Sequence, residues 1–334
     1  MEIRSLGRSG LKVTNLCLGT MTFGNQSDKE TAFAIMDKAY EAGINFFDTA
    51  DVYPLGGTFE QLGSTEETIG DWLKGKRDKI VLASKCFGAM GPGANERGLS
   101  RKHIIESIED SLRRLKTDYL DLYQAHQFDE TVPLEETLRA FDDLVTQGKV
   151  RYIGVSNWRS WQIAKALGIA ERKNFVPIES VQPRYNLLFR MIEDDLVPMC
   201  TSEGIGLITY NPLAGGMLTG RYQGGQQVEA GTRFGLAGVS KAGQLYQDRY
   251  WQEPIFEAVE RYKKWCAEHG YDMAITAVRW VTQQPGITSA IIGASRPEQL
   301  DASLAAAEQP RLVEEELRWL DQLWFSLPRR REDR

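Results

Sequence analysis

The sequence predicts an α/β fold that closes into one eight-stranded barrel. Short apolar, β-prone runs alternate with longer segments of helical periodicity through most of the 334 residues. The apolar runs are short and nearly continuous, which is typical of parallel strands covered on both faces. Since no Pro-, Gly- or Ser-rich linker separates two halves, we expect residues 1–334 to form a single domain, a (β/α)8 TIM barrel.

Each of the eight expected strands begins one βα unit. They are predicted at residues 16–19, 44–49, 80–84, 120–124, 151–156, 178–182, 206–210 and 290–293. Before the first strand, residues 2–4 and 11–13 flank Gly7 and Gly10, and this pattern predicts an N-terminal hairpin over the barrel floor.

Amphipathic helices are expected between the strands. Residues 104–115 and 134–145 each carry an apolar stripe at helical spacing. Ser27 and Ser64 are each followed three residues later by a Glu, which matches the capping-box pattern of helix starts.

Residues 223–252 interrupt this alternation of strands and helices. The segment is rich in Gly and Gln and has little periodicity, so we expect a long loop after the seventh strand, of the kind that often serves as a lid. Two helices beyond the eight of the barrel are also expected, one within residues 223–269 and one at residues 313–325.

The composition indicates a cytoplasmic protein without metal. The net charge of −6 gives no electrostatic reason to expect nucleic acid or an anionic membrane as a partner. No segment has the pattern of a signal peptide or a membrane span. The four cysteines lie far apart and only three histidines are present, so we expect reduced thiols and no metal site. The oligomeric state is not predicted.

Polar side chains gather at the ends of the predicted strands, where α/β barrels hold their active sites. Asp48 ends the second strand, and Tyr53 follows it in the run DTADVY. Lys85 follows the third strand and His126 the fourth. The later strands end in further polar residues: Ser156, Asn157, Gln182, Tyr210 and Asn211.

A phenol, an ammonium, a carboxylate and an imidazole at one barrel mouth indicate a proton-transfer site. A phenol with a pKa of about 10 is a weak acid unless a nearby cation stabilises its anion. Lys85 can serve as that cation, and Asp48 can keep it charged and oriented. A neutral His126 can donate a hydrogen bond to a substrate oxygen. Such a set can protonate an oxygen on which negative charge develops, as carbonyl reduction requires.

Each of these residues has a structural alternative when it is taken alone. Asp48 fits a helix cap or a turn, Tyr53 a loop aromatic, Lys85 a solvated strand end, and His126 a core histidine. The functional interpretation rests on their joint position at or just past the ends of three consecutive strands.

At these residues the chain resembles the aldo-keto reductase family. The resemblance rests on DTADVY (48–53), SK (84–85), the His126 segment, GVSN (154–157), Gln182, YNPLAGGMLTG (210–220) and IIGASRPEQL (291–300). It covers nearly the whole chain and implies an NADPH-dependent reductase of aldehydes or ketones, with Tyr53 as general acid, Asp48 and Lys85 tuning it, and His126 orienting the carbonyl.

The resemblance also implies where NADPH/NADP+ binds. The implied cofactor residues are Gly19, Thr20, Met21, Asp48, Ser156, Asn157, Gln182, Tyr210, Asn211, Pro212, Leu213, Gly215, Gly216, Leu218, Arg221, Gly293, Ala294, Ser295, Arg296, Gln299 and Ser303. Two positions depart from the family pattern, since the family often has Asn at position 303 and more commonly Ser at position 211.

One feature of the residues themselves favours NADPH over NADH. Ser295, Pro297 and Glu298 mark a helix start just past the eighth strand, where free N–H groups and the helix dipole favour a phosphate. Arg296 adds a guanidinium suited to bidentate phosphate contact. No GxGxxG motif follows a strand, so a Rossmann fold has no support.

The expected substrate is a small carbonyl compound. The expected pocket residues are Phe23, Tyr53, Phe87, His126 and Trp158, bordered by residues 52–63, 87–97 and 223–252. An aromatic entrance would suit a flat or sugar-like carbonyl compound. An equally favoured alternative is that some of these rings only pack against loops and do not contact substrate. Deoxysugars, pyridoxal-like aldehydes and xenobiotic ketones all stay open.

Two other functions stay open at this point. Some barrels of this type, such as the potassium-channel β subunits, bind nucleotide and act mainly through a protein partner, with little turnover. Alternatively, Lys85 could form a Schiff base, as in an aldolase-type barrel.

Overall fold

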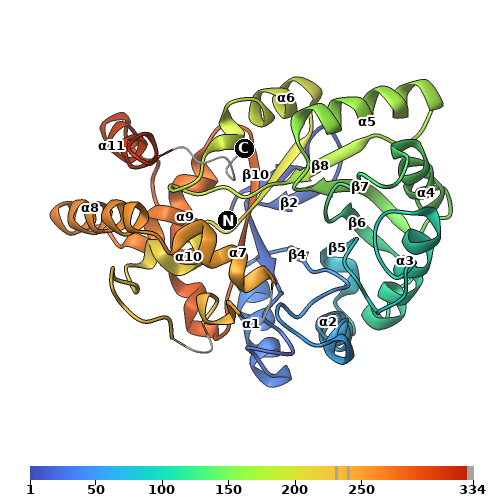
Figure 1. Ribbon diagram of the computed structural model, residues 1–334, viewed down its shortest axis with the longest axis horizontal. Helices are drawn as coiled ribbons and strands as arrows, with labels where there is room; N and C mark the ends of the chain where they lie inside the picture. Colours follow the sequence, from blue (N-terminus) through green and yellow to red (C-terminus); the bar gives the residue numbers. More distant parts are fainter. Residues whose placement is uncertain (230–231, 239–240, 329–334) are drawn as a thin grey trace.

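The computed structural model describes residues 1–229, 232–238 and 241–328. Eight parallel strands close into a barrel in the order β10-β3-β4-β5-β6-β7-β8-β9, with β9 paired to β10 (Figure 1). The strands are β3 (Leu16–Gly19), β4 (Phe46–Asp48), β5 (Val81–Cys86), β6 (Leu120–Ala125), β7 (Val150–Ser156), β8 (Ile178–Gln182), β9 (Gly206–Tyr210) and β10 (Ile287–Gly293). The predicted barrel is confirmed, with strand ends shifted by a few residues.

Helices surround this barrel and connect successive strands (Figure 1). The helices of the βα units are α1 (Lys29–Glu41), α2 (Ser64–Trp72), α3 (Arg101–Leu115), α4 (Leu134–Thr146), α5 (Ser160–Lys173), α6 (Leu196–Glu203), α9 (Met273–Gln283) and α10 (Asp301–Ala306). Apolar residues fill two regions: a small cluster inside the barrel that includes Phe46, Leu122 and Ile208, and a large one between strands and helices. This is the packing expected of the fold.

The predicted hairpin is also confirmed. Strands β1 (Ile3–Ser5) and β2 (Lys12–Thr14) pair antiparallel, and the turn between them packs against the start of β9. A Cβ added to Gly7 would lie 2.5 Å from the carbonyl oxygen of Gly204, so only glycine fits this contact. The hairpin therefore covers the amino-terminal end of the barrel, opposite the strand ends that carry the polar residues.

The prediction for residues 223–252 is wrong in part. The segment contains a 3-10 turn at Phe234–Leu236 and the helix α7 (Lys241–Tyr250); residues 230–231 and 239–240 lie outside the described residues. Phe234 and Trp251 pack with Tyr222, and their ring centroids lie 5.0–5.5 Å apart. These aromatic contacts order the segment, although its local sequence lacks periodicity.

As a result, three helices rather than the expected two are added to the barrel helices in the described part of the chain. Besides α7 they are α8 (Glu253–His269) and α11 (Glu314–Phe325), which lie side by side on one flank of the barrel (Figure 1). Among the described residues, no helix combines the length and apolarity that a membrane span requires.

The two predicted capping boxes are wrong. Helix α1 is capped by Asp28, whose carboxylate accepts the N–H of Thr31, whereas Ser27 donates its hydroxyl to the Ser295 carbonyl. Helix α2 begins at Ser64 itself after Gly63, whose φ is 85°. At α1 the Ser27 hydroxyl is used in this tertiary contact, and the carboxylate of the next residue caps the helix instead.

Candidate active site

A cavity of about 1030 Å³ opens at the carboxyl-terminal ends of the barrel strands. It collects all but one of the cofactor residues expected from the sequence, together with Tyr53 and His126. The exception is Leu218, which is fully buried in the core and does not line the cavity. Segments far apart in the chain thus meet at one surface, because parallel strands all end at the same side of the barrel.

Asp48 and Lys85 form a buried ion pair at the base of this cavity. The Lys85 ammonium donates to Asp48 Oδ2 at 2.5 Å and to the Thr49 carbonyl at 2.8 Å, and the Lys85 side chain is fully buried. Burial by itself lowers the pKa of Lys85, but the charges of Asp48 and Tyr53 outweigh it, so the pKa is raised. The lysine is therefore a fixed cation.

Tyr53 and His126 lie beside this cation. The Lys85 Nζ atom is 5.1 Å from the centre of the Tyr53 ring, and the Tyr53 and His126 ring centres are 6.0 Å apart, edge to face. Burial raises the pKa of the Tyr53 phenol, although Lys85 acts in the opposite direction. Burial and the charge of Lys85 lower the pKa of His126 to about 3. The site thus presents a protonated phenol and a neutral imidazole.

A hydrogen-bond chain joins the ends of β6, β7, β8 and β9. The Tyr210 hydroxyl donates to Asn157 Oδ1 at 2.9 Å, and Asn157 Nδ2 donates to Ser156 Oγ at 2.9 Å and to the His126 carbonyl at 3.2 Å. The Ser156 hydroxyl in turn donates to the carbonyl of Gln182 at 2.9 Å. Asn157 has a φ of 59°, a conformation that asparagine tolerates better than most residues. This chain holds the cavity wall in one arrangement.

The loop after β9 is organised by Asn211. Its Oδ1 accepts the Gly215 N–H at 2.6 Å, and its Nδ2 donates to the Tyr250 hydroxyl at 3.0 Å. Gly215 and Gly216 have φ values of 70° and 101°, so this wall of the cavity is backbone without side chains. The asparagine at position 211 therefore shapes the loop and ties it to α7.

The opposite end of the cavity lies after β10. A 3-10 helix begins at Pro297, and Arg296 precedes it and lines the cavity. Gln299 Oε1 accepts the Ser295 N–H at 2.8 Å. The helix start expected here is present, although Arg296 rather than Ser295 occupies the capping position.

The structure does not bring three of the expected pocket aromatics to the cavity. Phe23 and Trp158 are buried in the core, and Phe87 packs against it. Trp158 meets Phe128 edge to face at 4.8 Å. Phe23 lies in the loop after β3, and its ring is fully buried in the core cluster. These three residues do not line the cavity in the structure, and a contact with substrate stays a prediction for them.

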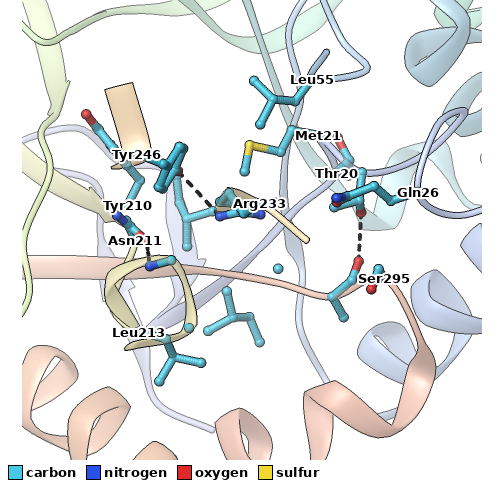
Figure 2. A pocket seen from close by; sticks show the side chains of 18 of the residues that line it. Thr20, Met21, Gln26, Leu55, Tyr210, Asn211, Leu213, Arg233, Tyr246 and Ser295 are labelled. Atoms are coloured by element: carbon cyan, nitrogen blue, oxygen red, sulfur yellow. Dashed lines mark hydrogen bonds between the residues drawn. The ribbon is translucent and has the colours of Figure 1, made fainter. Parts of the chain in front are cut away.

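Other side chains line the cavity in their place. Figure 2 shows Met21 and Leu55 together with Tyr246 and Arg233, whose guanidinium donates to the Tyr246 hydroxyl at 3.4 Å. Sequence reasoning missed Tyr246 and Arg233 because they belong to the segment predicted as a loop. The signal available was the cluster of aromatic residues late in that Gly- and Gln-rich segment.

Behind the site, Asp51 is a second buried carboxyl. It is fully buried, and neither of its oxygens accepts a hydrogen bond of normal geometry from the described residues. The neighbouring Glu66 already pairs with Arg114 at 2.7 Å and accepts the Ser84 hydroxyl at 2.6 Å. Burial, reinforced by the charge of Glu66, raises the pKa of Asp51 well above its usual value. Asp51 therefore favours its neutral form.

We expect Asp51→Asn to stabilise the protein at neutral and alkaline pH only. A carboxyl with a raised pKa in the folded state contributes stability at low pH and loses it as the pH rises, by ~1.4 kcal/mol for each unit of elevation. Asparagine does not titrate. Urea unfolding at about pH 4 and about pH 8 should show the advantage of the variant growing with pH. A difference in unfolding free energy that is the same at both pH values would contradict the prediction.

The comparisons with known proteins agree with this geometry. The aldo/keto reductase family model matches residues 15–324. An uncharacterized oxidoreductase of Bacillus subtilis, YrpG, is 39% identical over 92% of this chain and 91% of its own length. Probable and putative voltage-gated potassium channel β subunits are 37% identical in both Arabidopsis thaliana (99% of each chain) and Schizosaccharomyces pombe (97% of this chain, 93% of the relative). The chain belongs to the aldo/keto reductase family of oxidoreductases.

Proposed function

We propose that the protein reduces aldehydes or ketones to alcohols with NADPH, using Tyr53 as general acid. The observation that carries this proposal is the buried Asp48–Lys85 pair placed against a protonated Tyr53 and a neutral His126 in one cavity. A small carbonyl compound is the substrate class that this set suits, since its oxygen gains negative charge as it is reduced.

The cavity fits a nucleotide cofactor with phosphate groups. Four arginines line it, Arg221, Arg233, Arg249 and Arg296, and the backbone at Gly215 and Gly216 is exposed to it. Guanidinium groups and free backbone N–H groups are the usual partners of phosphates. When bound, the dihydronicotinamide supplies a hydride to the carbonyl carbon. Tyr210, Ser156, Asn157 and Gln182 are the residues proposed to hold that ring.

The side chains of this chain then act on the carbonyl oxygen. Neutral His126 donates a hydrogen bond that positions the oxygen, and the Tyr53 hydroxyl transfers its proton to it. The phenolate that remains is stabilised by the Lys85 ammonium, which Asp48 holds in place at 2.5 Å. Asp48 and Lys85 are buried, whereas Tyr53 and His126 are half-buried at the cavity wall, so the ion pair is shielded from water and its interactions are strengthened.

A turnover assay tests the proposed function. Purified protein should oxidise NADPH in the presence of members of a panel of aldehydes and ketones, followed by the loss of the reduced-nicotinamide absorbance. The same panel with NADH should give slower turnover at equal cofactor concentration. If no carbonyl compound of the panel is reduced with either NADPH or NADH, the proposal is contradicted.

We expect NADPH to bind more tightly than NADH because Arg296, at the helix start after β10, would hold the 2′-phosphate. Titration of both cofactors by protein fluorescence measures the preference. Arg296→Ala should weaken NADPH by about tenfold and leave NADH nearly unchanged. Equal affinities of the unmodified protein for the two cofactors would defeat this assignment.

A second candidate is a regulatory nucleotide-binding barrel. The observation that favours it is the set of relatives named as potassium-channel β subunits, which match this chain over nearly its full length. The same turnover assay, combined with a pull-down against a membrane fraction, separates it from the reductase. A Schiff-base role for Lys85 has less support, because its raised pKa and its bonds to Asp48 and Thr49 keep the amine protonated.

The cytoplasm is the compartment we propose for this protein. All four cysteines are free and buried, and reduced thiols are usual there.

A further inference from the structure

Gln124 on β6 reaches the Asp48 carboxylate from inside the barrel. Its Nε2 donates to Asp48 Oδ1 at 3.1 Å, and the Gln124 side chain is fully buried. Gln182 donates to the same oxygen at 2.8 Å, and its amide also lies 3.3 Å from Gln124 Oε1. The two amides therefore grip one oxygen of Asp48, while Lys85 holds the other at 2.5 Å.

This arrangement fixes the orientation of Asp48. A carboxylate with donors on one oxygen resists rotation, so the second oxygen stays directed at Lys85. Donors to Asp48 Oδ1 also stabilise part of its negative charge away from the lysine. Asp48 then compensates less of the positive charge of Lys85, and this charge stabilises the Tyr53 phenolate more strongly.

The strand next to β6 leaves room for this contact. Gly154 on β7 lies opposite Gln124 in the sheet. A Cβ added at Gly154 would lie 2.4 Å from Ser180 Oγ and 3.2 Å from Gln124 Cγ. The backbone of Gly154 does not have a positive φ, so glycine is favoured at this position because it has no side chain. The space it leaves lets the Gln124 side chain cross the barrel interior to Asp48.

We propose that Gln124 is a positioning residue of the active site, which orients Asp48 and thereby sets how strongly Lys85 supports ionisation of Tyr53. Gln124 does not touch the cavity, so its effect passes through Asp48. The kinetic part of the test rests on the proposed reductase function, and the spectroscopic part does not.

The first variant is Gln124→Met, which keeps the length of the side chain and removes the amide. We expect kcat to fall about tenfold, with little change in the KM of the aldehyde or in NADPH affinity. The alkaline limb of the kcat profile should move to higher pH, because a less neutralised Asp48 raises the pKa of Tyr53. Ser180→Ala is the matched control, since its buried hydroxyl, which is close to Gly154, makes no hydrogen bond among the described residues.

The second variant, Gln124→Glu, separates hydrogen-bond donation from packing. A glutamate buried beside the Asp48 carboxylate has a raised pKa, so it should stay protonated and donate to Asp48 at neutral pH. The activity of this variant there should be closer to that of the unmodified protein than the activity of Gln124→Met, and it should fall relative to the unmodified protein as the pH rises and the glutamate ionises. A merely structural role of Gln124 predicts no such pH-dependent loss. Thermal unfolding of each variant checks that the fold is retained.

A spectroscopic readout keeps the inference independent of turnover. The difference between each protein and its Tyr53→Phe counterpart in an alkaline ultraviolet titration isolates the Tyr53 phenolate. Its midpoint should lie higher in Gln124→Met than in the unmodified protein or in Ser180→Ala. If the unmodified protein reduces no carbonyl but the midpoint moves as expected, only the proposed function fails. An unmoved midpoint and an unchanged kcat profile would overturn the role of Gln124.

Discussion

Tyr53→Phe is expected to abolish turnover while the affinity for NADPH stays within about twofold. Loss of a positioned general acid removes typically 10²–10⁴ of the rate, and no other phenol meets both Lys85 and His126 among the described residues. The ring itself remains, so the packing against His126 is kept. Steady-state kinetics on the best carbonyl substrate and fluorescence titration of NADPH measure the two quantities.

A second phenol supplies the control for this prediction. Tyr123 is buried in the core outside the cavity, so Tyr123→Phe removes a hydroxyl of the same kind without touching the site. We expect that variant to retain turnover. If Tyr53→Phe reduces carbonyl compounds as fast as Tyr123→Phe, Tyr53 is not the acid.

Lys85→Met is expected to cost both activity and stability. It leaves Asp48 buried and charged without its cation, and loss of one partner of a buried pair costs about 3–5 kcal/mol. Since Gln124 and Gln182 still donate to Asp48, we expect the lower end of that range, about 3 kcal/mol in the free energy of unfolding. Urea unfolding at neutral pH measures it.

A double variant tests the cause of that loss. Asp48→Asn removes the stranded charge, so the pair Asp48→Asn/Lys85→Met should be more stable than Lys85→Met alone. The two single losses should therefore not add. Additive losses would show that Lys85 stabilises the fold through packing of its aliphatic stem instead. Lys85→Met, Asp48→Asn and the double variant should all lack turnover. Without Lys85, Tyr53 has no neighbouring cation. In Asp48→Asn, Lys85 is present but loses the carboxylate that holds it.

Local sequence sufficed for the barrel because its signals are repeated. Each strand is a short apolar run followed by a helical stripe, and eight such units admit few other arrangements. The position of the proposed catalytic set was predictable for a related reason. Polar residues directly after buried strands must lie at the same edge of the barrel, so Asp48, Lys85 and His126 meet whatever the loops do.

Residues on loops required the tertiary structure. Phe23 and Trp158 lie in the loops beyond β3 and β7, whereas Asp48 is the last residue of β4. Their rings are buried in the core, since an apolar ring gains more from burial than from the cavity surface. The segments on either side of α7 are held together by contacts between Phe234, Trp251 and Tyr222, which no local periodicity predicts.

The sequence by itself therefore determined the barrel, its hairpin and the four groups at the strand ends. Only the tertiary structure decided the surroundings of those groups: the two amides that donate to Asp48, the buried Asp51 with its raised pKa, and the α7 side chains Tyr246 and Arg249 that line the cavity. The physical reason is the distance along the sequence between the residues that interact. Strand and helix periods are set by neighbours in the chain, whereas burial, charge and hydrogen-bond partners in this site come from residues 30 or more positions apart.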